Sequence, residues 1–127
     1  MTFWHTRSNR KPTGGGLSTP WKVKKKTQRG SEATKTTIGE KKIKTEKVSG
    51  GNLKMRAQKI NTASILDTKT GKSKKANITD VLENSANQHF TRMKIITKGA
   101  ILQTSEGKAR VTSRPGQNGT VSAIKIE

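Results

Sequence analysis

The chain has 127 residues, of which only 28% are hydrophobic, and it carries a formal net charge of +19 without a single cysteine. This length fits one domain with an appendage better than two domains, and the lack of cysteine excludes a disulfide framework and thiolate chemistry. Because so large a charge repels itself in a compact state, the composition predicts a polyanionic partner, either nucleic acid or an anionic membrane.

A membrane is the less favoured partner. The longest apolar runs are short ones such as Ile95-Ile96, which cannot span a bilayer. The N-terminus has no apolar segment of the kind found in signal peptides, and no basic stretch carries Leu or Phe at the helical spacing of an interfacial anchor. We therefore expect an intracellular protein that binds no membrane.

Residues 1–31 predict an extended basic arm without a core. They contain eight Lys or Arg residues and no Asp or Glu. Pro12 and Pro20 interrupt any helix, and Gly14–Gly16 give the backbone wide freedom. Of the 22 Leu, Ile, Val and Phe residues, 19 lie after Gly30, so the core is expected in residues 32–127.

The side chains of this arm predict contacts with RNA. Trp4 and Trp21 are flat rings among cations, and such rings stack on unpaired bases. Gly14 and Gly15 would let the backbone pass close to an RNA groove. Alternatively, the rings dock back onto the folded part of the chain. The cations expected to pair with phosphates are Arg7, Arg10, Lys11, Lys22, Lys24, Lys25, Lys26 and Arg29.

From residue 32 onward, apolar and polar residues alternate with a period of two, which indicates short β-strands. In Leu53–Ile60, Leu53, Met55 and Ala57 are expected to face a core, with Lys54 and Arg56 on a cationic outer face. Many short strands with glycine-rich turns predict a mainly β fold, a small antiparallel barrel. The expected strands are Ile43–Val48, Leu53–Ile60, Ala63–Asp67, Lys74–Leu82, Phe90–Lys98, Ala100–Thr104, Lys108–Ser113 and Thr120–Ile126.

Three connections between these strands have distinctive sequences. Thr70-Gly71-Lys72-Ser73 resembles the end of a phosphate-binding loop, but the glycine that should come five residues before Gly71 is missing, so a hairpin turn is expected within Asp67–Lys72. Glu83–Gln88 is expected to be a polar loop or one helical turn. Pro115 and Gly116 suit the centre of a type II turn. Arg110 and Arg114, which both precede this turn, are candidates for phosphate contacts.

No residue pattern predicts catalysis. His5 and His89 lie far apart in the sequence, and neither a cysteine nor a carboxylate cluster accompanies them, so a metal site lacks ligands. The carboxylates are scattered singly, and no serine or threonine has an evident His–Asp partner arrangement. We expect no enzymatic activity, no cofactor, no metal and no small-molecule substrate.

Several segments, in order along the chain, resemble the archaeal and eukaryotic ribosomal protein S-eight-e family. The resemblance covers nearly the whole chain, and the short length is similar to that of the archaeal branch. Residues 16–21 depart from the family, whose members tend to be richer in arginine there. The matching segments are Trp4–Arg7, Arg10–Gly15, Thr37–Glu40, Gly50–Asn52 with Lys54 and Arg56, Ile96–Ile101, Ala109–Gly119 and Ile126-Glu127.

The resemblance implies a structural constituent of the small ribosomal subunit in the cytoplasm. The implied fold is a compact β-barrel body with an N-terminal arm threaded along ribosomal RNA (rRNA). The implied partners are small-subunit rRNA and neighbouring small-subunit proteins. Two alternatives stay open: a ribosome-assembly factor that leaves the mature particle, and a general RNA-binding protein that is indifferent to the RNA supplied.

Overall fold

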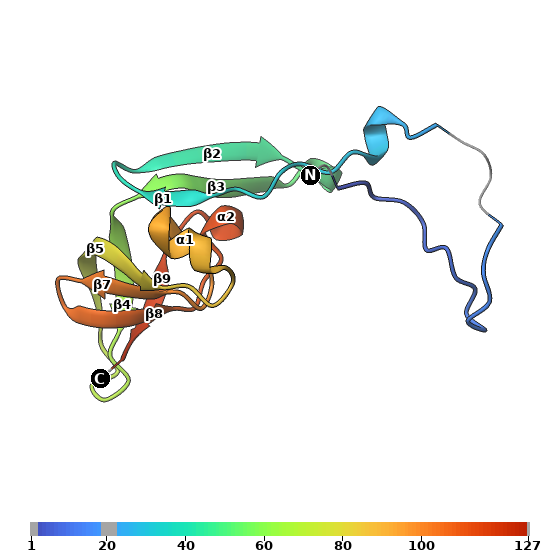
Figure 1. The fold of residues 1–127 in the computed structure, drawn as a ribbon. Helices are drawn as coiled ribbons and strands as arrows, with labels where there is room; N and C mark the ends of the chain where they lie inside the picture. Colours follow the sequence, from blue (N-terminus) through green and yellow to red (C-terminus); the bar gives the residue numbers. More distant parts are fainter. Residues whose placement is uncertain (1–2, 19–22, 127) are drawn as a thin grey trace. The chain divides into compact units, whose positions relative to one another are not determined.

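The computed structural model describes residues 3–18 and 23–126 (Figure 1). The chain forms two compact units, Met1–Ala33, called the arm below, and Thr34–Glu127, called the body. The arm contains the 3₁₀ turn η1 (Lys26–Gln28). The elements of the body are β1 (Thr36–Ile38), β2 (Lys42–Lys47), η2 (Ser49–Gly51), β3 (Leu53–Ile60), β4 (Thr62–Leu66), β5 (Ser73–Glu83), α1 (Gln88–Arg92), β6 (Ile95–Ile96), β7 (Ile101–Thr104), β8 (Gly107–Val111), α2 (Pro115–Asn118) and β9 (Ser122–Lys125).

The centre of the body is a closed barrel with the strand order β4-β5-β7-β8-β9, which confirms the predicted barrel (Figure 1). Four of its pairings are antiparallel, and β4 pairs with β9 in parallel. A ring with an odd number of strands cannot alternate in direction all the way round, so a five-stranded barrel needs at least one parallel pair. Strand directions alone therefore fix this departure from a purely antiparallel barrel.

Small and larger apolar side chains alternate along the inner face of the barrel. On β4, Ala63 is followed two residues later by Ile65, and on β8 Ala109 is followed by Val111; all four are at most 4% exposed. Leu102 on β7 is fully buried in the same cluster. A narrow barrel has room for few large side chains, so alternating sizes fill it without voids. This is how a chain with so few hydrophobic residues still builds a core.

A second sheet, with the strand order β2-β3-β1-β6, completes the body. The sequence did not predict β1, which is only three residues long and polar at two of them. Thr36 is nevertheless 1% exposed, and its hydroxyl donates a 2.7 Å hydrogen bond to the carbonyl oxygen of Ala57. That bond satisfies the buried hydroxyl, which is why a threonine is tolerated at this place.

The expected core face of β3 is only partly buried. Leu53 is 65% exposed and Met55 is 54% exposed, whereas Ala57 is fully buried. The prediction was wrong for the first two residues because β3 pairs there only with β2, in a hairpin (Figure 1). Pairing with β1 begins at Lys59. Alternation reports which residues share a face, but not whether anything covers that face.

The segment predicted as a strand over Phe90–Lys98 instead begins in a helix. The side chain of Asn87 caps α1 by accepting a 2.9 Å hydrogen bond from the backbone N–H of His89. Such a cap stabilises a helix start and competes with an extended backbone. Lys94 has a left-handed φ of +52°, and of the predicted segment only Ile95–Ile96, which follow it, form a strand.

The break at Arg114–Gly119 is a short helix and not the expected type II turn. Pro115 stands in the first turn of α2, where its missing N–H is not needed. The helix ends at Gly119, whose left-handed φ is 74° and whose N–H donates to the carbonyl of Pro115. A Cβ at Gly119 would lie 2.9 Å from the Cβ of Met55, so this glycine also permits the close packing of α2 on β3.

Candidate nucleic-acid interface

The described arm is a loop whose two ends meet, and not one continuous extended tail. The backbone N–H of Gly30 donates to the carbonyl of Phe3, and the N–H of His5 donates to the carbonyl of Gln28, both at 2.7 Å. Between these bonds, Trp4 and Arg29 form an isolated β-bridge. Backbone groups close the loop, so its base does not depend on a hydrophobic core.

A second, smaller turn lies farther along the arm. Arg10 and Gly16 form an isolated bridge, and the N–H of Lys11 donates to the carbonyl of Gly15 at 2.8 Å. Gly14 needs to be glycine because its φ is +87°. Gly15 has no such φ, and a Cβ added to Gly15 or Gly16 would meet nothing within 4 Å. The arm's own packing therefore does not require glycine at these two positions.

The predicted phosphate-binding cations of the arm are exposed wherever the structure describes them. They are Arg7, Arg10, Lys11, Lys24, Lys25, Lys26 and Arg29. Arg7, Lys24 and Lys25 line one hollow together with polar side chains such as Asn9 and Gln28. Trp21 and Lys22 lie outside the described residues. The fold thus brings three of the predicted cations to one concave surface.

The aromatic rings of the described arm lie near its base. The Lys24 ammonium stands 5.7 Å from the centroid of the Trp4 ring, within the range of a cation–π contact. Phe3 is 68% exposed, and its ring meets His5 edge-on with 5.1 Å between centroids. Trp4 is half-buried. A flat ring held this way next to an exposed cation has the chemistry of a base-stacking platform.

Two of the predicted body residues make contacts within the body. The Nε atom of Arg56 lies 2.6 Å from a carboxylate oxygen of Glu46, and the Arg56 side chain is 15% exposed. Its Nη1 also donates a 3.5 Å hydrogen bond to the carbonyl of Gly116. Lys54 Nζ donates to Gln117 Oε1 at 3.0 Å and remains exposed. Arg56 thus fastens α2 to the β2–β3 hairpin, and Lys54 is the more available of the two.

The other two predicted body residues are exposed but lie on different elements. Arg114 is the residue that precedes α2, next to the segment that Arg56 holds. Arg110 lies on β8, where its neighbours across the strands are Ile101 and Ile124. The surroundings of Arg110 are therefore largely apolar, unlike those of Arg114.

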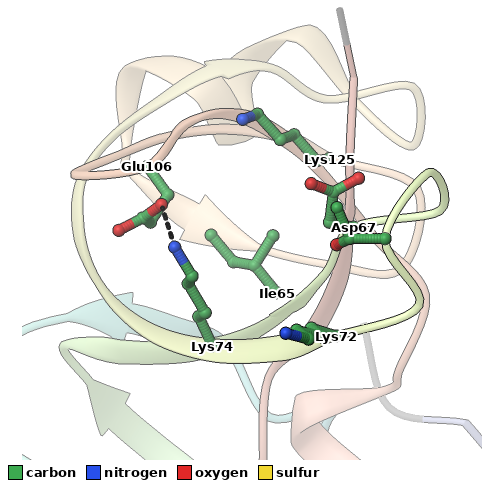
Figure 2. Close-up of a pocket in the computed structure, with 7 residues that line it drawn as sticks. Ile65, Asp67, Lys72, Lys74, Glu106 and Lys125 are labelled. Atoms are coloured by element: carbon green, nitrogen blue, oxygen red, sulfur yellow. Dashed lines mark ion pairs between the residues drawn. The ribbon is translucent and has the colours of Figure 1, made fainter.

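One end of the barrel carries charged residues that the sequence reasoning did not single out (Figure 2). Lys74 Nζ lies 3.7 Å from Glu106 Oε2 in a hollow at this end. The same hollow is also lined by Lys72, Lys125 and Asp67. In Figure 2 these side chains surround Ile65. Three lysines among residues 72–75 were the available signal, but only the closure of the barrel brings Glu106 and Lys125 beside them.

Hydrogen bonds lower the pKa values of two half-buried aspartates of the body. The backbone N–H of Lys69 donates to Asp67 at 3.0 Å and is the largest cause that lowers the pKa of Asp67. The N–H of Val81 at 2.8 Å, followed by the Lys94 ammonium at 3.2 Å, lowers the pKa of Asp80. Each of these carboxylates serves the local structure. Neither has the raised pKa of a general acid.

The TGKS-like segment is the loop between β4 and β5, as predicted, and a strand follows it in place of the helix that a phosphate-binding loop requires. Across residues 3–18 and 23–126, no three His, Cys, Asp or Glu side chains gather where they could hold a metal ion. Within the same residues, no helix is long and apolar enough to cross a membrane.

Comparison with known proteins identifies relatives over nearly the whole chain. The family model described as "Ribosomal protein S8e" matches residues 4–126. A protein of Methanococcus aeolicus named "Small ribosomal subunit protein eS8" is 46% identical over 127 residues, covering 99% of this chain and 98% of the relative. Proteins of the same name from Methanocorpusculum labreanum and Methanospirillum hungatei are each 44% identical, covering 98% of this chain and 99% and 98% of the relatives.

Proposed function

This chain belongs to the ribosomal protein S8e family of small-subunit structural constituents, and we propose that it binds rRNA chiefly through the arm. The body adds a smaller number of contacts. The family is not one of enzymes, and its members are located on the small subunit in the cytoplasm.

The observation that carries the proposal is the charge of the arm. Residues 1–31 contain eight cations and no acid, and every described cation among them is exposed. Glu32 is the first acidic residue of the sequence, so residues 1–31 have no carboxylate side chain of their own to neutralise these cations. Phosphate groups of RNA supply the missing negative charge, and binding releases their condensed counterions.

The small turn at residues 10–16 is the second support. Gly15 and Gly16 have open space where a Cβ would stand, so glycine is not needed there for packing. Between Arg10 and Leu17, a backbone without side chains can lie closer to a ribose-phosphate chain than any side chain permits. Lys11, in the same turn, is placed to pair with a phosphate on that chain.

Base stacking on Trp4 is the third element of the proposal. The ring stands beside Lys24, so a base stacked on it would have a cation close to its phosphate. Trp21 belongs to the proposal on its sequence context alone. On the body, Lys54 and Arg114 are the proposed additional phosphate contacts, and Arg56 acts by holding α2 next to them.

Copy number on the mature particle tests this function against the two alternatives. A structural constituent remains at one copy per small subunit after a high-salt wash. An assembly factor is present on precursor particles and missing from mature subunits. A general RNA-binding protein is removed by the wash and also binds unrelated RNA with equal affinity. Quantitative mass spectrometry of washed mature subunits, with unrelated RNA as competitor, separates the three.

A further inference from the structure

A row of side chains crosses the outer wall of the barrel on four neighbouring strands. The strand register pairs Ile101 of β7 with Arg110 of β8, Arg110 with Ile124 of β9, and Ile124 with Leu66 of β4. The residue next to each in sequence is buried in the barrel: Leu102, Ala109, Ala123 and Ile65. Because successive side chains of a strand point to opposite faces, the row points outward.

On these four strands, the row and the rows on either side of it contain no acidic residue; on β5, the fifth strand of the barrel, Glu83 faces Ile101, and Asp80, which pairs with Lys94, faces Gln103. On one side lie Lys108 and Ile126, joined by a 2.9 Å bond from the N–H of Ile126 to the carbonyl of Lys108. On the other side lie hydroxyl side chains, with the N–H of Thr112 donating to the carbonyl of Ser122 and Ser122 facing Ser64. Leu66 is 40% exposed, and Ile101, Ile124 and Ile126 are half-buried.

We infer that this outer row is a docking surface for a neighbouring protein of the small subunit, one that presents apolar side chains and an acidic residue opposite Arg110. The inference rests on the proposed function. An apolar centre with an arginine in it is the composition that protein–protein interfaces favour. Charge complementarity calls for the acid, because Arg110 and Lys108 are exposed cations whose direct neighbours across the strands are Ile101, Ile124 and Gln103, and Glu83 and Asp80 lie one strand farther away on β5.

RNA and a second copy of this chain both fit this surface less well than such a protein. RNA is bound by aromatic rings and cations, whereas branched aliphatic side chains offer neither a stacking face nor a hydrogen bond. A second copy of this chain would bring Arg110 and Lys108 of one copy toward those of the other, between two molecules that each carry +19. A partner with the opposite charge avoids both difficulties.

The direct test is photo-cross-linking on assembled subunits. A benzophenone amino acid replaces Ile124 in the full chain, and the matched control carries it at the exposed Thr79 of β5. We expect Ile124 to cross-link to a single small-subunit protein and Thr79 not to give that product. Cross-links from Ile124 to rRNA, to a second copy, or to nothing overturn the inference while leaving the proposed function intact. A wild-type chain that does not enter mature subunits overturns both.

Arg110 provides an independent test. If it pairs with an acidic protein group, Arg110→Ala leaves the salt dependence of binding to naked rRNA unchanged, and Arg110→Glu is lost from subunits at lower salt than Arg110→Lys. If Arg110 pairs with phosphate, Arg110→Ala lowers the slope of log affinity against log salt by about 0.7–0.9, and the inference fails. Because the side chain is exposed, the variants are expected to keep the melting temperature of the wild-type protein.

Discussion

The arm and the body use their cations in opposite ways. In the body, Arg56 meets Glu46, Lys74 meets Glu106 and Lys94 meets Asp80, so part of the positive charge is neutralised internally. In residues 1–31 no acid is present, and backbone hydrogen bonds at the base hold the described loop together. The body therefore neutralises part of its own charge, whereas the proposed function assigns the neutralisation of the arm to the phosphates of rRNA.

The largest effect that should separate the two units comes from the core. Leu102→Ala removes a fully buried side chain from the barrel and should cost about 2–5 kcal/mol of unfolding free energy. Leu53→Ala, at a site 65% exposed, should change it by less than about 0.5 kcal/mol. Chemical denaturation followed by circular dichroism measures both. Equal losses would contradict the placement of the core inside the barrel.

A smaller effect tests how α2 is fastened to β3. Gly119→Ala introduces both a left-handed alanine and a Cβ 2.9 Å from that of Met55, and should cost roughly 2–3 kcal/mol. Gly71→Ala is the matched control, since Gly71 has φ +66° with open space around it and should lose only about 1 kcal/mol. Thermal unfolding of the two variants gives the difference. If Gly71→Ala loses as much unfolding free energy as Gly119→Ala, the close contact with Met55 does not contribute to the cost.

The smallest effect is the pH dependence of the body. The folded-state pKa values of Asp67 and Asp80 lie below the ordinary 3.8, so both carboxylates favour the folded state above that pH. This stabilisation should fade as the pH falls below about 4 and through the lowered pKa values. We expect the melting temperature to decline over that range, and less steeply in Asp80→Asn. A melting temperature that rises on acidification would contradict the claim that the ionised forms of Asp67 and Asp80 stabilise the fold.

The sequence predicted the barrel because alternation survives on strands such as β4, where Ala63 and Ile65 are buried on either side of the exposed Ser64. It did not predict β1, since three residues are too few for a periodic signal and Thr36 is buried by a hydrogen bond to Ala57. It placed Leu53 in the core because periodicity does not reveal where covering elements end.

The candidate interface was predicted to a similar extent. The charge of the arm is evident from composition, but the closed loop depends on backbone bonds between Phe3–His5 and Gln28–Gly30, far apart in sequence. Alternation along β3 predicts Arg56 as an outward cation, whereas its side chain meets Glu46, which lies on another strand and is not evident from a local pattern. The apolar surroundings of Arg110 follow from the register of β7, β8 and β9, which no local pattern contains.

The central claim is that the arm's cations bind phosphate and the body does not need them. The most direct measurement compares Arg7→Ala/Arg10→Ala/Lys11→Ala with a matched body variant, Lys41→Ala/Lys75→Ala/Lys98→Ala, whose three lysines are also exposed. Binding to small-subunit rRNA is titrated at several salt concentrations. We expect the arm variant to lower the slope of log affinity against log salt by roughly 2–3 at an unchanged melting temperature, and the body variant to lower it far less. An equal change in both variants, or an arm variant that melts earlier and binds rRNA normally, would contradict the account.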